Sequence, residues 1–151
     1  MVLIMSVFSA FNINASGMTA QRYRMDIISE NVANANTTRT EDGSPYVRKV
    51  VTFAEKDTQT PFSRVLNNAR DNYSGHGVKV SGVYEDSETD MNMVYDPSHP
   101  DADENGYVTY PNVNIVTEMT NLIDASRSYE ANATAFTASK AMAMKGFEIG
   151  R

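Results

Sequence analysis

Residues 111–151 read PNVNIVTEMTNLIDASRSYEANATAFTASKAMAMKGFEIGR. One stripe through this stretch has spacings that alternate four and three: Ile115, Met119, Leu122, Ser126, Tyr129, Ala133, Phe136, Lys140, Ala143 and Phe147. This is the a/d spacing of a coiled coil, so we predict one long helix whose seam needs a partner. Asn112 or Asn114 can cap the first turn, and Glu118 suits the positive end of the helix dipole.

A second seam with a seven-residue period lies near the N-terminus. Its positions are Phe11, Asn14, Met18, Gln21, Met25, Ile28, Val32 and Ala35. The polar residues on this stripe favour a seam that specifies register and partner at a cost in stability, while an ordinary amphipathic helix on a globular core is the alternative. Because Gly17 also weakens the helix, we expect it to be stable only against neighbours.

The middle of the chain is predicted to be small and irregular. Short strands are expected at Tyr46–Phe53, Val78–Tyr84, Met91–Tyr95 and Tyr107–Tyr110, with an ambiguous short helix at Pro61–Tyr73. Asn105-Gly106 is a tight-turn pair. We therefore predict an α+β, mainly α chain: an N-terminal helix over residues 1–37, a β and loop insert over 38–110, and a C-terminal helix over 111–151. The two terminal helices are expected to pack in a coiled-coil-like arrangement.

Composition narrows the classes of function. The net charge of −6 argues against binding to nucleic acid or to anionic membranes, and the absence of cysteine excludes disulfides and thiolate chemistry. Met1–Phe11 is apolar, but the first arginine is Arg22, so a cleaved secretory signal is not expected. No apolar run reaches the ~18 residues that a membrane span needs.

One acidic stretch contains no lysine or arginine. Its acids are Glu85, Asp86, Glu88, Asp90, Asp96, Asp101, Asp103 and Glu104. Asp101–Gly106 matches the first half of a calcium-binding loop, but the twelfth position, which should be a bidentate Glu, is Asn112. His76 and His99 are far apart in sequence, and no nucleophile or phosphate-loop motif is present. The residues therefore support neither an enzyme nor a cofactor or metal site.

Several stretches resemble the axial proteins of the bacterial flagellum, and among these the basal-body rod proteins of the proximal rod. The matching stretches are Ala15–Gln21 and Asn31–Thr37, then Thr38–Thr40 with Gly43, Pro45–Tyr46 and Arg48–Lys49, then Tyr95–Val108, and finally Pro111–Asn114, Glu118–Met119 and Ala125–Asn132. The N-terminal stretches are typical of axial proteins in general, whereas the acidic loop joined to Pro111–Asn114 is specific to this family. Ser98 departs from it, since the family usually has Gly there.

The resemblance implies a structural subunit that assembles helically around the export channel and transmits motor torque. It implies export by the flagellar type III apparatus without a cleaved signal, and a place in the rod crossing the periplasm. The implied partners are other proximal rod proteins, the distal rod protein, and the membrane (MS) ring with its rod adaptor. No nucleic acid, small-molecule substrate or cofactor is implied. The expected assembly interface consists of Phe11, Met18, Gln21, Met25, Ile28, Val32, Asn34, Ile115, Met119, Leu122, Tyr129 and Phe136.

Three alternatives remain open from the sequence. Another axial protein, of distal-rod or hook type, would be expected to carry a larger β insert. A secreted calcium-binding module would use the Asp101–Gly106 loop, and calcium calorimetry would identify it. A hydrolase would use the acidic stretch, although no pair of carboxylates can be nominated for it.

Overall fold

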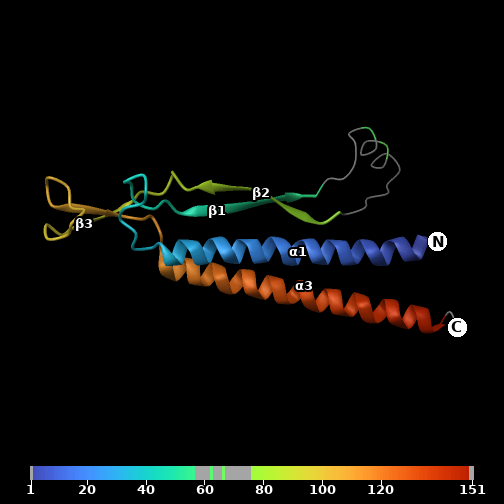
Figure 1. The fold of residues 1–151 in the computed structure, drawn as a ribbon. Helices are drawn as coiled ribbons and strands as arrows, with labels where there is room; N and C mark the ends of the chain where they lie inside the picture. The colour runs from blue at the N-terminus through green and yellow to red at the C-terminus, as the bar shows by residue number, and fades with distance from the viewer. Residues whose placement is uncertain (1, 57–61, 63–65, 67–75, 150–151) are drawn as a thin grey trace. The chain divides into compact units, whose positions relative to one another are not determined.

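The computed structural model describes residues 2–56, 62, 66 and 76–149, with side chains for those of residues 9–148. Figure 1 shows its elements in chain order: α1 (Val2–Ala33), β1 (Lys49–Glu55), β2 (Val78–Glu85), β3 (Asn92–Tyr95), β4 (Tyr107–Tyr110) and α3 (Ile115–Ile149). The predicted class, α+β and mainly α with two long terminal helices, is confirmed. Of the ambiguous stretch Pro61–Tyr73, only Phe62 and Leu66 are described, and both are helical.

The chain forms two compact units, and each contains part of both long helices. Unit 1 comprises Met1–Arg22, Phe53–Ser81 and Arg127–Arg151, and unit 2 comprises Tyr23–Thr52 and Gly82–Ser126.

In unit 1 the two helices pack side by side and run in opposite directions. The rings of Phe11 and Phe136 lie 5.0 Å apart, centroid to centroid, and further along the pair Gly17 faces Asn132. A Cβ atom at Gly17 would lie 2.8 Å from Asn132 Oδ1, closer than side chains normally approach. The glycine that weakens α1 as an isolated helix therefore permits close approach of α3.

In unit 2 the start of α3 has a side-chain cap. Asn114 Oδ1 accepts the backbone N–H groups of Val116 (3.0 Å) and Thr117 (3.2 Å), which have no partner inside the helix. Of the two expected caps, Asn114 is therefore the one that forms. Asn112 is buried and its amide donates to the backbone carbonyls of Asp86 and Thr89.

Two pairs of strands occur in the sequence after α1 and before α3. β1 pairs with β2, and β3 pairs antiparallel with β4 in the register Asn92↔Tyr110 to Tyr95↔Tyr107. The predicted turn at Gly106 is present with φ +82°, a conformation that favours glycine. β1 begins three residues later than predicted, since the Tyr46 N–H bonds back to the Thr37 carbonyl (3.1 Å) instead of to a strand.

The buried interior of the described residues is small and partly polar. The buried apolar residues are Ala20, Ile28, Ala35, Tyr46, Val108 and Ala125. Asn31, Asn112 and Glu118 are buried with them. Polar groups in such positions must be hydrogen-bonded if the fold is to be stable.

Candidate functional site

The most densely bonded region is a polar cluster in unit 2. We call it the Asn31 cluster, and its members are Asn31, Tyr46, Arg48, Lys49, Asp86, Asn112 and Glu118. These residues come from the end of α1, the segment that leads into β1 with its first residue, the residue that follows β2, and the segment that leads into α3 with its first turn. The cluster therefore joins segments that are far apart in sequence.

Asn31 is only 1% exposed, and every hydrogen-bonding position of its amide is used. Its Nδ2 donates to the Lys49 carbonyl (2.8 Å) and to Glu118 Oε2 (3.1 Å). Its Oδ1 accepts the Tyr46 hydroxyl (2.8 Å) and the Lys49 N–H (2.9 Å). An amide has two donor and two acceptor positions, so this side chain is fully satisfied.

Glu118, also 1% exposed, is held by Arg48. Glu118 Oε1 accepts Arg48 Nε (2.9 Å) and Nη2 (2.7 Å), while Arg48 Nη1 donates to Asp86 Oδ2 (3.2 Å). Burial alone would lower the pKa of Arg48, but the hydrogen bond and charge of Glu118, aided by Asp86, raise it. Removing either partner would leave a charge in a buried setting, which costs roughly 3–5 kcal/mol.

Tyr46 connects this ion pair to β1. Its hydroxyl donates to Asn31, and the Lys49 ammonium lies 5.6 Å from its ring centroid while pairing with Glu30. Burial, followed by the negative charges of Glu30, Glu118 and Glu85, raises the pKa of Tyr46 to about 12. The phenol is therefore a hydrogen-bond donor at neutral pH and not a base.

The Asn31 cluster stabilises the fold and offers no open ligand position on its amide. Among the described residues, no group of three or more His, Cys, Asp or Glu side chains is placed to hold a metal ion. None of the described helices combines the length and apolar character needed to cross a membrane.

The structure divides the predicted assembly residues between two environments. Ile28 is buried, and eight are half-buried: Phe11, Met18, Gln21, Met25, Val32, Asn34, Leu122 and Phe136. Phe136 contacts Phe11 of the same chain, so at least these two rings serve contacts within the subunit. Ile115, Met119 and Tyr129 are 43%, 55% and 36% exposed.

α3 carries a second apolar face in unit 2, which we call the external stripe. It consists of Ile115, Val116, Met119 and Ile123, whose exposed fractions run from 43% to 75%. The neighbouring face of the same helix holds the buried Glu118 and Ala125. The predicted seam shares Ile115 and Met119 with the external stripe and continues through the half-buried Leu122, so the sequence pattern merges the two faces.

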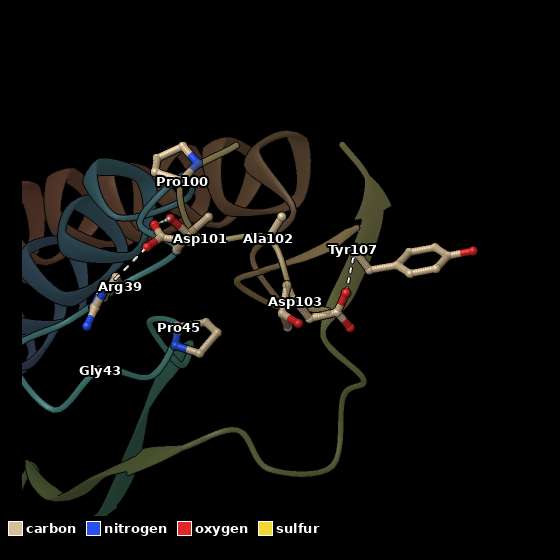
Figure 2. Close-up of a pocket in the computed structure, with 10 residues that line it drawn as sticks. Arg39, Gly43, Pro45, Pro100, Asp101, Ala102, Asp103 and Tyr107 are labelled. Carbon is tan, nitrogen blue, oxygen red and sulfur yellow. Dashed lines mark hydrogen bonds and ion pairs between the residues drawn. The ribbon is translucent and has the colours of Figure 1, made fainter. Parts of the chain in front are cut away.

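Figure 2 shows where the carboxylates of the calcium-like loop point. Asp101 turns towards Arg39, with 3.7 Å between its Oδ1 and Arg39 Nη1, and its Oδ2 accepts the Thr38 hydroxyl (2.8 Å). Asp103 Oδ1 instead accepts the backbone N–H groups of Asn105 (2.9 Å) and Tyr107 (2.8 Å). The two carboxylates thus stabilise separate parts of the loop, which does not favour a calcium site.

Asp86 and Asp96, two other acids of the acidic stretch, also accept hydrogen bonds that stabilise local structure. Hydrogen bonds from Thr89, and then Arg48, hold the pKa of Asp86 below its usual range. Hydrogen bonds from Ser98 lower the pKa of Asp96. Ser98, the departure from the family pattern, therefore stabilises this turn through its hydroxyl and backbone N–H.

Sequence reasoning missed the Asn31 cluster as a unit. Asn31, Tyr46, Arg48 and Glu118 occur in the family-like stretches, but no spacing rule connects residues that lie 15 to 87 positions apart. The available signal is Glu118, the acid in the first turn of α3, but the helix dipole alone already explains an acid at that position.

Comparisons with known proteins match this chain to flagellar rod proteins, by family models at its two ends and by relatives over nearly its whole length. The family model described as "Flagella basal body rod protein" matches residues 11–39, and "Flagellar basal body rod FlgEFG protein C-terminal" matches residues 104–149. "Flagellar basal-body rod protein FlgC" of Bacillus subtilis (strain 168) is 46% identical, with 97% of this chain and 100% of the relative covered. The protein of the same name from Borreliella burgdorferi is 44% identical (91% and 93% covered), and that from Escherichia coli O6:H1 is 37% identical (97% and 100% covered).

Proposed function

Because the chain belongs to the FlgC family of flagellar basal-body rod proteins, it is a structural subunit of the proximal rod, and we propose that the external stripe of α3 is one of its assembly faces. The sequence-based identification of the family and of a rod subunit is thereby confirmed. The supporting observation is that α3 exposes four large apolar side chains together, those of Ile115, Val116, Met119 and Ile123. A cluster of exposed apolar side chains on a folded protein marks an interaction surface.

The proposed partners of this face are helices of neighbouring rod subunits. An apolar stripe along a helix fits a second helix with knobs-into-holes packing. The neighbours that we propose are the other proximal rod proteins, the distal rod protein, and the MS ring with its adaptor. In this arrangement the subunits assemble helically around the export channel and transmit torque without catalysing a reaction.

We further propose that the subunit reaches the rod, which crosses the periplasm, through the flagellar type III export apparatus without a cleaved signal. The absence of cysteine suits a chain that passes unfolded through a channel and is not fixed by disulfides. Neither alternative, the calcium module or the hydrolase, gains support from the described carboxylates, which do not converge.

A substitution on the external stripe tests the proposal. In a strain that lacks the chromosomal copy, Met119→Glu should be produced normally but should fail to enter purified basal bodies, because a buried unpaired charge opposes packing. The control is Thr117→Glu, which makes the same charge change at an exposed position outside both faces of α3. Normal incorporation of Met119→Glu would exclude this face from assembly. Failure of the unmodified chain to enter basal bodies would refute the rod function itself.

A further inference from the structure

Unit 1 contains a groove of about 480 Å³ between α1 and the start of β2. Ala15, Ala20 and the valines Val78 and Val80 are among the residues that line it. Lys56 and Lys79 also line this groove, and both are exposed. Asn12, Ser16 and Thr19 complete the lining, so the groove is mainly apolar with some polar groups, and it is positively charged where the two lysines lie.

Hydrogen bonds hold the groove in shape. The Ser16 hydroxyl accepts the Val78 N–H (3.0 Å) and donates to the Ile13 carbonyl (2.7 Å), and the Lys56 N–H donates to the Gly77 carbonyl (2.9 Å). Gly77 has φ +91°, and a Cβ atom there would overlap the Ser16 side chain. A preformed groove loses little conformational entropy when it binds.

The charge and shape of the groove indicate what it can accept. An apolar groove with two lysines at its rim suits an aromatic or aliphatic projection flanked by carboxylates. A neutral projection would leave the lysines uncompensated, and a basic one would be repelled.

The β3–β4 hairpin in unit 2 has these properties. Met93, Tyr95 and Tyr107 are 60%, 63% and 42% exposed, and the register Tyr95↔Tyr107 places them on the same face of the strand pair. The two tyrosine rings pack edge to face with centroids 5.2 Å apart. At the turn Asp103 and Glu104 are exposed, and no lysine or arginine occurs between Lys79 and Arg127.

We propose that the tip of the β3–β4 hairpin of one copy docks into the Lys56–Lys79 groove of a second copy. The inference rests on the proposed rod function and names one of its subunit contacts. The contact joins two different surfaces, so it is heterologous and can propagate along a helix instead of closing a dimer. This is the contact type that a helical rod requires.

Paired cysteines test the contact, since the chain contains no cysteine of its own. A chain with Lys79→Cys and Glu104→Cys, incorporated into basal bodies and oxidised, should give a ladder of disulfide-linked copies. The matched control, Lys79→Cys with Glu41→Cys, uses an exposed acid of unit 2 outside the hairpin and should give several-fold less. Single-cysteine variants should give no ladder beyond a dimer.

Charge reversal and a carbodiimide cross-link provide independent readouts. Lys79→Glu and Glu104→Lys should each reduce swarming, and the two together should restore part of it. If these variants are not produced, carbodiimide treatment of unmodified basal bodies should still join Lys56 or Lys79 to Asp103 or Glu104 of another copy.

The outcomes separate the two levels of the proposal. Incorporated, motile cysteine variants without a ladder would refute the docking contact and leave the rod function intact. A cross-link from Lys79 to a protein of different mass would refute a second copy as the occupant. Absence of the unmodified chain from basal bodies would refute the rod function instead.

Discussion

Replacement of Asn31 by alanine is the most direct test of the Asn31 cluster. The substitution removes four hydrogen bonds, of which three join neutral partners and one ends on the Glu118 carboxylate. A neutral bond contributes about 1 kcal/mol net and a bond to a charged group about 1.5–3 kcal/mol, so we expect a loss of about 4.5–6 kcal/mol in the free energy of unfolding.

The assay is urea unfolding of the purified full-length subunit, followed by circular dichroism. Asn36→Ala is the matched control, because Asn36 is an exposed asparagine just beyond α1 and should change stability by no more than about 0.5 kcal/mol. Single domains of this size are stable by about 5–15 kcal/mol, so the Asn31 variant can be too unstable to titrate. Tyr46→Phe then serves instead, since it removes only one of the four bonds and should cost about 1 kcal/mol.

A loss below about 1.5 kcal/mol for Asn31→Ala would refute the reasoning, because water or a rearranged Glu118 would then be replacing the amide at little cost. A double-mutant cycle with Glu118→Gln provides a second check. The two positions share the bond between Asn31 Nδ2 and Glu118 Oε2, so their effects should not be additive.

Three other predictions use the same titration. Since folding raises the pKa of Tyr46 from 10.0 to about 12, the stabilisation by its neutral phenol is complete below about pH 10 and is lost as the pH rises through 12. Tyr46→Phe should therefore make the fall in the free energy of unfolding between about pH 10 and 12 shallower. An unchanged slope would contradict the assignment. Gln21 Oε1 is buried without a hydrogen-bond partner among the described residues, so Gln21→Met should raise the free energy of unfolding by about 1 kcal/mol, whereas a decrease would mean that the amide has a partner. Phe136→Ala removes the half-buried ring that packs on Phe11 and should cost about 2 kcal/mol, roughly half the value for a fully buried ring, while Phe147→Ala, at a 69% exposed position, should change little; equal effects would exclude the helix contact.

The long helices could be predicted from the sequence because their repeats are uninterrupted over many turns. Asn114 as a cap and Gly106 as a turn also follow from local chemistry, since each acts within a few residues of its own position. The sequence did not reveal that Gly17 permits close approach of α3, because that requirement comes from Asn132, more than a hundred residues away.

The division of α3 into two faces could not be predicted from its spacing. The buried face contains Glu118 and Ala125, and the external stripe contains Val116 and Ile123. At 100° per residue the centre of the whole external stripe lies roughly 125° from the centre of Glu118 and Ala125, and the predicted seam runs between the two centres. A pattern search for one apolar stripe finds the mean of two adjacent stripes, and it rejects Glu118 because that residue is charged.

The expected weakness of α1 also varies along its length in a way that composition does not show. Ile28 and Asn31 are buried, so the last turns of α1 are fixed by unit 2. The polar seam position Gln21 lies in unit 1, and its Oε1 accepts no hydrogen bond from the described part of the chain. The sequence pattern predicts that the whole N-terminal helix needs neighbours, whereas the structure limits this expectation to its earlier turns.

The Asn31 cluster also restricts the register in which α1 and α3 can pack, which their seven-residue repeats alone leave ambiguous. Seams with a seven-residue repeat match again after a slip of one heptad, about 10 Å, because apolar residues still face apolar residues. Such a slip would separate Asn31 from Glu118. It would also withdraw Glu118 from Arg48, because the neighbouring Lys49 backbone is bonded to Asn31 on α1 through its carbonyl (2.8 Å) and its N–H (2.9 Å).

Breaking a buried ion pair in this way costs roughly 3–5 kcal/mol, whereas the apolar seam alone distinguishes the two registers weakly. Replacing the cluster by apolar residues of similar volume could preserve stability while removing this distinction. We infer that the buried charges at the start of α3 specify one register of α3 against α1. The position of the external stripe on the subunit surface depends on that register.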